Sequence, residues 1–420
     1  MGLSLGFHII FAAIGMAMPF FMAAAHWMWI QTEDKTYFDL TKTWSKGVAI
    51  FFAVGAVSGT VLSFELGLLW PKFMEYAGAI IGMPFSWEGT AFFIEAIALG
   101  IFLYGWDKIP KTIHWISGLC VGVSGVLSGL FVVCANGWMN TPRGFDWVDG
   151  KPIHIDPWAA MFNPASFVQG FHMIIAAFSA TGFAVAAIHA FGLVKNPSSD
   201  FHKKALKIAL VFGSVAAILQ PLQGDRLAKT VAMRQPEKLA TFESLFKSEK
   251  PASLLIGGFP SEETQTVRFG LHVPRLLSFL AHGDFSSEVM GLDQFPRETW
   301  PPIAPVHFSF QLMVAVGTFL ALVGALSLVF VLGKTASLNR RGFLNLLMVC
   351  GPLGFLALEA GWVVTEVGRQ PWIIYGIMRT SDAVSPVPGL TYSMVVITSL
   401  YCLLAFVVIW LMVRQFRHVS

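Results

Sequence analysis

Charged residues are scarce in this chain of 420 residues: Asp, Glu, Lys and Arg make up 13% of it, whereas 55% is hydrophobic. Water-soluble domains carry about 25% charged residues, so the composition excludes an ordinary soluble globular protein. The net charge of +3 is too small to indicate a nucleic-acid partner. The composition therefore predicts an integral membrane protein.

Cysteine is scarce as well, and no two cysteines form a CxxC pair of the kind found in zinc and thiol redox sites. All four cysteines fall inside apolar stretches, which favours the interpretation that they are small core residues: Cys120, Cys134, Cys350 and Cys402. No cleavable signal peptide is evident, because the first apolar stretch is long enough to span a membrane and lacks a basic region before it.

Long apolar runs are what the chain has instead. A membrane-spanning helix needs about 20 apolar residues, and nine such runs lie at about 7–30, 47–70, 87–106, 113–136, 166–193, 205–222, 305–332, 342–365 and 391–413. A polar segment separates the sixth run from the seventh. We therefore predict an all-α membrane bundle of about nine helices. Six lie in residues 1–222 and three in 305–420, and 223–304 forms one large loop.

Basic residues orient this bundle. They concentrate after the first, third, fifth and seventh runs: Lys35, Lys42, Lys46, Lys108, Lys111, Lys195, Lys203, Lys204, Lys207, Lys334, Arg340 and Arg341. Short loops rich in Lys and Arg stay in the cytoplasm. The amino terminus and the large loop are therefore predicted to face outward, and the carboxy terminus to face the cytoplasm.

Five side chains able to bind iron or carry protons are predicted to share one depth of this bundle: His8, Glu88, His172, Met313 and Glu359. A charged side chain inside hydrocarbon costs about 2.5 kcal/mol or more, so such residues are usually functional. The first four lie near the starts of inward-running spans, and Glu359 lies in the last third of an outward-running span. All five are thus expected in the outer third of the bilayer.

The chemistry of these residues suits iron and protons. His8 and His172 are candidate axial haem ligands, and a His/Met pair with Met313 would raise the potential of a haem. A lone methionine in an apolar helix is otherwise core filler. Glu88 and Glu95 are seven residues apart, so they project from nearly the same helix face and could pass protons through the bundle.

The same seven-residue spacing separates Glu359 from Glu366, and Arg369 lies one turn further on. Arg369 could neutralise Glu366 or hold a haem propionate, and an interfacial salt bridge explains the pair equally well. Spacing alone does not identify haem. A proton-coupled transporter could also carry His and Glu in its bundle, although its site would lie near the midplane.

Longer strings carry a family resemblance across nearly the whole chain. They are FHIIFAAIGMAMP around His8, WEGTAFFIEA around Glu88, ANGWMNTP at 135–142, QPEKLATFE at 235–243, FQLMVAVG around Met313 and EAGWVVTEVGRQPW at 359–372. In these strings and their order the chain resembles subunit I of the cytochrome bd quinol oxidases. The large loop looks like the short type of quinol loop, closest to the cyanide-insensitive branch.

The resemblance implies a role for each residue of the outer layer. His172 and Met313 would be the axial ligands of a low-spin haem b. His8 and Glu359 would serve a high-spin haem b and a haem d, or a third haem b in its place. Glu88 would lie close to that site as ligand or proton donor, and Glu95 would continue the proton route.

The resemblance also implies a substrate site, partners and a location. Lys238 and Glu243 match the positions that contact quinol. Quinol would be oxidised at the outer face and oxygen reduced to water with protons from inside, in a bacterial or archaeal cell membrane. A homologous second membrane subunit and a small single-helix subunit would be the partners.

Two departures from the family pattern leave alternatives open. Gln311 stands where the family usually has an arginine, two residues before the methionine ligand, and the chain begins almost at His8. The first alternative is a haem-bearing paralogue that passes quinol electrons to another acceptor. The second is a proton-coupled transporter or an assembly subunit without oxidase activity.

Overall fold

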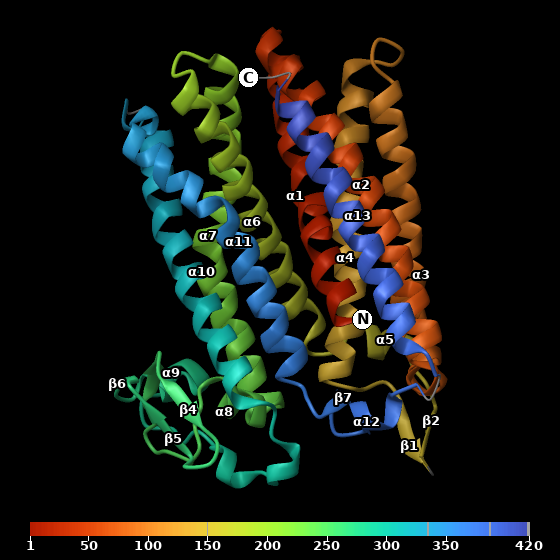
Figure 1. The fold of residues 1–420 in the computed structure, drawn as a ribbon, viewed down its shortest axis with the longest axis vertical. Coiled ribbons are helices and arrows are strands. Elements are labelled where there is room, and N and C mark those ends of the chain that lie inside the picture. The colour runs from red at the N-terminus through yellow and green to blue at the C-terminus, as the bar shows by residue number, and fades with distance from the viewer. Residues whose placement is uncertain (149, 334–335, 386–387, 418–420) are drawn as a thin grey trace.

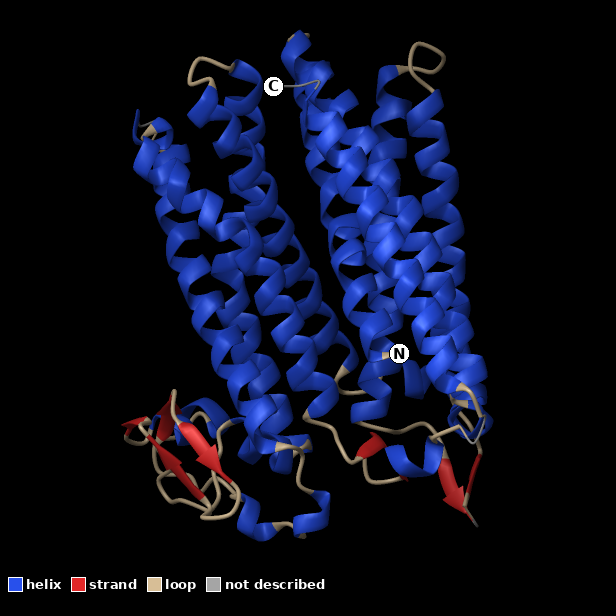
Figure 2. Cartoon of the chain, viewed as in Figure 1, coloured by secondary structure: helices blue, strands red, loops and turns tan. Residues whose placement is uncertain are grey.

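The computed structural model describes residues 1–148, 150–333, 336–385 and 388–417. Lys334, one of the residues used to orient the bundle, lies outside these ranges. Within them, nine helices are long and apolar enough to cross a membrane. The prediction of an all-α membrane bundle is therefore confirmed, and strands are confined to short hairpins at one end (Figure 2).

Four of the long helices form a first bundle: α1 (Gly2–Thr32), α2 (Lys35–Leu69), α3 (Pro71–Tyr104) and α4 (Lys111–Asn140). In this bundle α1 packs on α2 and α4, and α3 packs on the same two helices. The last long helix, α13 (Leu390–Arg417), lies outside the bundle against α2 and α1 (Figure 1).

Four others form a second bundle: α6 (Ser166–Lys195), α7 (Asp200–Arg234), α10 (Ile303–Leu332) and α11 (Arg341–Val367). Both α6 and α10 pack on α7 and on α11, so α6 and α10 are diagonal to each other. Contacts of α6 with α1 and α4 join the two bundles. A ligand between α6 and α10 would therefore lie on the axis of the second bundle.

Small residues allow the helices of the second bundle to approach closely. A Cβ added to Gly182 of α6 would lie 2.3 Å from the Cα of Gly213 in α7, and one added to Gly354 of α11 would lie 2.5 Å from the Cα of Ala180 in α6. Water does not drive helices together inside a bilayer, so close van der Waals packing of small residues takes over this task. These positions hold α6 between its two neighbours.

Short elements gather at one end of the molecule, called the loop end below, where the N-terminus also lies (Figure 1). Between α4 and α6 are β1 (Asp146–Val148), β2 (Lys151–Ile153) and α5 (Pro157–Met161). Between α7 and α10 are α8 (Pro236–Phe242), β3 (Leu254–Ile256), β4 (Phe259–Ser261), β5 (Thr266–Arg268), β6 (Leu271–Val273), α9 (Leu276–His282), η1 (Leu292–Gln294) and η2 (Arg297–Thr299). After α11 come β7 (Trp372–Ile374), β8 (Met378–Arg379) and α12 (Thr380–Ala383).

The strands form two-stranded antiparallel hairpins, namely β1–β2, β3–β6, β4–β5 and β7–β8. In the largest loop Leu255 pairs with His272 and Pro260 pairs with Val267. A separate small core, which includes Leu239, Phe242 and Val306, packs α8 against the start of α10. This core fixes the loop on the second bundle.

Three helices extend well beyond their apolar runs. The helix α2 begins at Lys35, α3 begins at Pro71, and α7 continues past residue 222 to Arg234. Lys72 and Glu75 lower the hydropathy of the first turns of α3, which is why the apolar run begins later. The prediction that Glu88 lies near the start of its helix is therefore wrong, because Glu88 lies near the middle of α3.

The interpretation of the cysteines as core residues holds for only part of the set. Cys134 and Cys350 are buried, whereas Cys120 and Cys402 are exposed on the surface of this chain. The reason is that an apolar helix in a membrane also carries apolar side chains on the face that it turns to lipid.

Candidate functional site

The second bundle positions His172 and Met313 on its two diagonal helices. The other two helices place a glycine beside each of them. A Cβ added to Gly224 of α7 would lie 3.6 Å from His172 Cε1, and one added to Gly361 of α11 would lie 3.0 Å from Met313 Sδ. An imidazole and a thioether on opposite helices, each flanked by a residue without a side chain, suit the two axial positions of a flat macrocycle.

Gln220 is a polar neighbour of His172 that the sequence analysis missed. Its Nε2 lies 3.1 Å from His172 Nε2 and 3.3 Å from Nδ1, and it donates to the backbone carbonyl of His172 at 3.3 Å. A ligand histidine usually donates its second ring N–H to an acceptor. The group of Gln220 that can accept it is the amide oxygen Oε1, which is buried and has no partner among the described residues. Gln220 could have been found in the sequence, because its amide side chain lies in an apolar run, one helical turn before Gly224.

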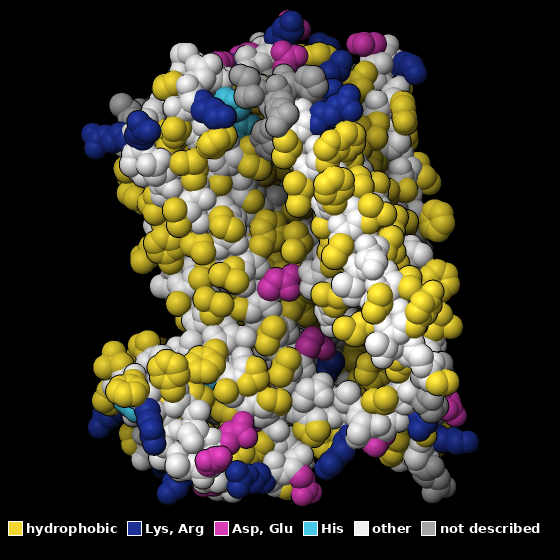
Figure 3. All heavy atoms as spheres, in the orientation of Figure 1, with side chains coloured by type: hydrophobic (Ala, Val, Ile, Leu, Met, Phe, Trp, Pro, Cys, Tyr) yellow, Lys and Arg dark blue, Asp and Glu magenta, His cyan; other side chains and the backbone are white. Residues whose placement is uncertain are grey.

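His8 lies on α1 in the first bundle and turns toward α2. Its Nδ1 lies 2.9 Å from Ser58 Oγ of α2, and a Cβ added to Gly59 would lie 3.1 Å from His8 Cε1. Glu359 approaches the same helix from the second bundle, because a Cβ added to Gly6 would lie 3.3 Å from Glu359 Oε2. Figure 3 shows a furrow between the two halves of the molecule with acidic side chains inside it.

One oxygen of Glu359 has no protein partner. Glu359 Oε1 is buried and accepts no hydrogen bond from the described residues. A buried polar atom without a partner is costly, so this oxygen fits a role as an iron ligand. Among the described residues no three His, Cys, Asp or Glu side chains converge to hold a bare metal ion. The candidate donors His8, His172, Met313 and Glu359 lie on four different helices.

Glu88 and Glu95 both turn toward α4. Ser128 Oγ donates to Glu88 Oε1 at 3.1 Å, and a Cβ added to Gly125 would lie 3.3 Å from Glu95 Oε1. Glu95 is buried and lies further from the loop end than Glu88. The two carboxylates therefore form a ladder between α3 and α4 that runs from mid-helix away from the loop end.

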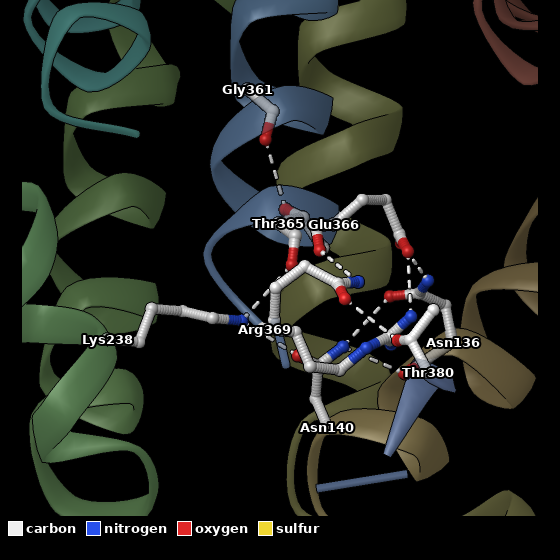
Figure 4. A network of polar contacts seen from close by, with 9 residues as sticks. Asn136, Asn140, Lys238, Gly361, Thr365, Glu366, Arg369 and Thr380 are labelled. Atoms are coloured by element: carbon white, nitrogen blue, oxygen red, sulfur yellow. Dashed lines mark hydrogen bonds and ion pairs between the residues drawn. The ribbon is translucent and has the colours of Figure 1, made fainter. Parts of the chain in front are cut away.

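Lys238 of α8 enters a polar network at the loop end (Figure 4). Its Nζ donates to Asn140 Oδ1 at 2.8 Å and to the carbonyl of Thr365 at 3.3 Å. Asn140 Nδ2 donates to Asn136 Oδ1 at 3.0 Å, and Asn136 Nδ2 donates to Glu366 Oε1. The network thus links the large loop to α4 and to the end of α11.

Arg369 ends this network. It is 3% exposed, and its Nη2 donates to Glu366 Oε2 at 2.7 Å. Its Nε and Nη1 have no partner among the described residues. The salt bridge to Glu366 therefore leaves two buried nitrogens, with three N–H groups between them, free for another anion, as a haem propionate would require.

The asparagines of this network were in view in the sequence but had no assigned role. Asn136 and Asn140 are four residues apart within ANGWMNTP, so they lie on one face of α4. Two amides on one face of an apolar helix end indicate a buried polar contact. Their partners on α8 and α11 could not be read from this spacing.

Lys238 and Glu243 are both buried, at 4% exposed each. Burial raises the pKa of Glu243 to about 8, and Glu243 Oε2 has no partner among the described residues. Burial is the main cause that lowers the pKa of Lys238 to about 7; the positive charge of Arg369 acts in the same direction, and the negative charge of Glu366 acts against it. Groups whose pKa values lie near neutrality are suited to accept and release protons.

The two side chains point to different surroundings. The ammonium of Lys238 is engaged by Asn140 and Thr365, whereas Glu243 lies just past the end of α8. A cavity of about 530 Å³ adjoins Asn140, the partner of Lys238. It is lined by Asn140, Thr141, Pro142, Arg143, Pro164, Arg234, Tyr375 and Gly376. Lys238 therefore lies one amide away from a cavity at the loop end.

Comparison with known proteins places this arrangement in context. The family model for cytochrome bd terminal oxidase subunit I matches residues 1–420. The chain is 34% identical to the putative cytochrome bd menaquinol oxidase subunit I of Bacillus subtilis, over 99% of this chain and 95% of that relative. It is 29% identical to the cytochrome bd-II ubiquinol oxidase subunit 1 of Escherichia coli, over 98% and 94% respectively. The bd oxidase structure from Geobacillus thermodenitrificans matches with a TM-score of 0.93 at 36% identity, over 99% of this chain and 96% of that one.

Proposed function

Because the chain belongs to the family of cytochrome bd terminal oxidase subunit I, we propose that it is the haem-bearing subunit of a membrane quinol oxidase that reduces oxygen to water. Relatives over nearly its full length are named as menaquinol and ubiquinol oxidases. The structural observation that supports the proposal is that His172 and Met313 lie on diagonal helices of one bundle, each with a glycine beside it.

Three haems would be held by this chain. His172 and Met313 would hold a low-spin haem b, and His8 and Glu359 would serve a high-spin haem b and a haem d, or a third haem b in its place. Arg369 would bind a propionate through Nε and Nη1, which have no partner among the described residues. When bound, the haems supply the one-electron and oxygen chemistry that amino-acid side chains lack.

Quinol would be oxidised at the loop end, which faces outward in the proposed orientation. Glu243 would accept a proton from a quinol hydroxyl in its ionised form, which is the minor form at neutral pH because burial raises its pKa to about 8. Lys238 would hydrogen-bond the ring oxygen in its neutral or charged form. The cavity beside Asn140 would let the released protons reach the outer solution. Menaquinol and ubiquinol, the substrates in the names of the relatives, both carry a quinol ring. Glu243 and Lys238 would contact this ring.

Protons for water would come from the cytoplasmic side. The ladder of Glu95 and Glu88 runs from that side toward the middle of the bundle, and Ser128 fixes Glu88 by a hydrogen bond. Protons released outside and taken up inside would separate charge across the membrane without a pump. In this arrangement the two bundles divide the reaction between them.

The proposed setting is a bacterial or archaeal cell membrane. Nine apolar helices among the described residues support a multi-pass protein. The partners would be a homologous second membrane subunit and a small single-helix subunit. Large apolar side chains on α2, α3 and α13 are exposed in the single chain and would face lipid or these subunits: Phe64, Leu68, Phe93, Ile97, Phe406 and Ile409.

The proposal is tested on the purified complex in two steps. Reduced-minus-oxidised absorption spectra should show haem, and quinol should drive oxygen uptake. Absence of haem would refute the oxidase function and favour a transporter or an assembly subunit. Haem without quinol-driven oxygen uptake would instead favour a paralogue that uses another electron acceptor.

A further inference from the structure

Two polar side chains at the start of α10 hold the large loop. His307 is 0% exposed, and Gln311 lies one turn further along the same helix. Both bind the backbone of the loop, so these contacts depend on the path of the loop and not on its side chains. His307 and Gln311 are called the clasp below.

Both ring nitrogens of His307 face backbone carbonyl oxygens. Nδ1 lies 2.9 Å from the oxygen of Phe242, and Nε2 lies 3.2 Å from the oxygen of Gly257. A carbonyl oxygen only accepts hydrogen bonds, and a neutral imidazole has one N–H to donate. The ring of His307 therefore lies between the two backbone segments and can donate to either carbonyl.

Gln311 contacts both β3 and the turn that follows it. Its Oε1 accepts from the amide of Gly257 at 3.0 Å, and its Nε2 donates to the carbonyl of Leu255 at 3.1 Å. Gly257 has a φ of 67°, a left-handed conformation that glycine adopts without strain. The turn thereby presents both the N–H and the C=O of Gly257 to α10.

The other end of the clasp lies beside Glu243. Phe242, whose carbonyl faces His307, is the residue directly before Glu243 and also stacks on Phe310 of α10 with ring centroids 4.2 Å apart. The carboxyl of Glu243 is buried with its Oε2 free. Its position is therefore determined by the backbone that His307 and Phe310 hold.

We propose that His307 and Gln311 are positioning residues for quinol oxidation, which fix the loop so that the free carboxylate oxygen of Glu243 meets the quinol. This inference rests on the proposed quinol site at Glu243. His307 acts through Phe242 on one side and, together with Gln311, through Gly257 on the other. Loss of the Phe242 contact should therefore matter more than loss of the Gly257 contact.

A matched pair of variants separates the two halves of His307. In His307→Asn the side-chain amide nitrogen lies near the place of Nδ1 and keeps the donor to Phe242, whereas in His307→Gln it lies near the place of Nε2 and keeps the donor to Gly257. We expect His307→Gln to lower kcat/KM for quinol about tenfold, the effect of one lost hydrogen bond. His307→Asn should retain most of the activity, and Gln311→Leu should have an intermediate effect.

A double-mutant cycle with Glu243→Gln distinguishes positioning from general stability. If His307 acts through Glu243, His307→Gln should have little further effect in the Glu243→Gln background. All variants are measured in the assembled complex with its low-spin haem signal intact, and His272→Asn and His272→Gln, at an exposed histidine of the same loop, serve as controls.

The outcomes separate the clasp from the quinol site on which it rests. If Glu243→Gln leaves quinol kinetics unchanged, the quinol site itself is wrong. If Glu243→Gln impairs quinol oxidation but His307→Gln does not, or if the two effects simply multiply, the positioning role of the clasp is refuted. Equal activity of His307→Asn and His307→Gln, both below wild type, would also contradict it.

Discussion

The two bundles have the same number of long helices but offer different donors. The second bundle presents an imidazole and a thioether, His172 and Met313, with a glycine next to each. The first bundle presents an imidazole, His8, together with the carboxylates Glu88 and Glu95, and it receives Glu359 from across the boundary. Neutral donors suit a site that only transfers electrons, whereas carboxylates also hold protons. Similar helix packing can therefore support two different halves of one reaction.

The contact between the two bundles also differs from one end of the molecule to the other. Away from the loop end they share one apolar core, to which α1, α6 and α11 all contribute. At the loop end a polar network joins Asn136 and Asn140 of the first bundle to Glu366 and Arg369 of the second. Lys238 links this junction to the large loop. The proposed quinol site is thus connected to both bundles and not to one alone.

The largest expected effect comes from removing a ligand of the second bundle. His172→Ala or Met313→Leu should abolish the low-spin haem signal in reduced-minus-oxidised spectra, because each change removes an axial donor. The protein should remain in the membrane. His189→Ala on the same helix and Met348→Leu in the same bundle should keep the signal. An unchanged low-spin signal in both ligand variants would break the distinction between the bundles.

A smaller and different effect is expected in the first bundle. Glu88→Gln and Glu95→Gln should lower quinol-driven oxygen uptake about 100-fold, the usual effect of losing a proton-transferring group. The low-spin haem signal should be unchanged, because these carboxylates belong to the other bundle. Glu75→Gln, at an exposed position near the start of α3, is the control. Loss of the low-spin signal in either variant would show that the two bundles are not functionally separate.

The smallest effect concerns the glycines of the second bundle. Gly361→Ala would place a Cβ 3.0 Å from Met313 Sδ, so the thioether must move by a few tenths of an ångström. Gly224→Ala would place a Cβ 3.6 Å from His172 Cε1, which is an ordinary contact. We expect Gly361→Ala to shift the midpoint potential of the low-spin haem and Gly224→Ala to leave it nearly unchanged. Equal shifts would mean that the glycines do not shape the space beside the methionine.

Much of the fold could be predicted because it depends on local properties of the chain. An apolar run of sufficient length must form a spanning helix in a membrane, since the backbone has no water to bind there. The nine runs therefore correspond to nine long helices among the described residues. For the run around Glu88 the predicted start of the helix was wrong. Lys72 and Glu75 lower the hydropathy there, although the helix already begins at Pro71.

The candidate residues could be identified individually, but not their partners. A histidine or glutamate in an apolar run is costly wherever the helix packs, so His8, His172, Glu88 and Glu359 were recognisable from the chain alone. That α6 and α10 lie diagonally depends on which small residues meet across helices, such as Gly182 and Gly213. Such contacts join residues far apart in the chain, and no local pattern specifies them.

The sequence thus determined the class of protein, the number of apolar spans and the residues able to bind iron or carry protons. Only the tertiary structure decided that Lys238 contacts Asn140 and that His307 holds the backbone beside Glu243. The physical reason is that hydropathy and side-chain chemistry belong to single residues or short runs. A buried hydrogen bond, in contrast, exists only where packing brings its donor and acceptor within about 3 Å of each other.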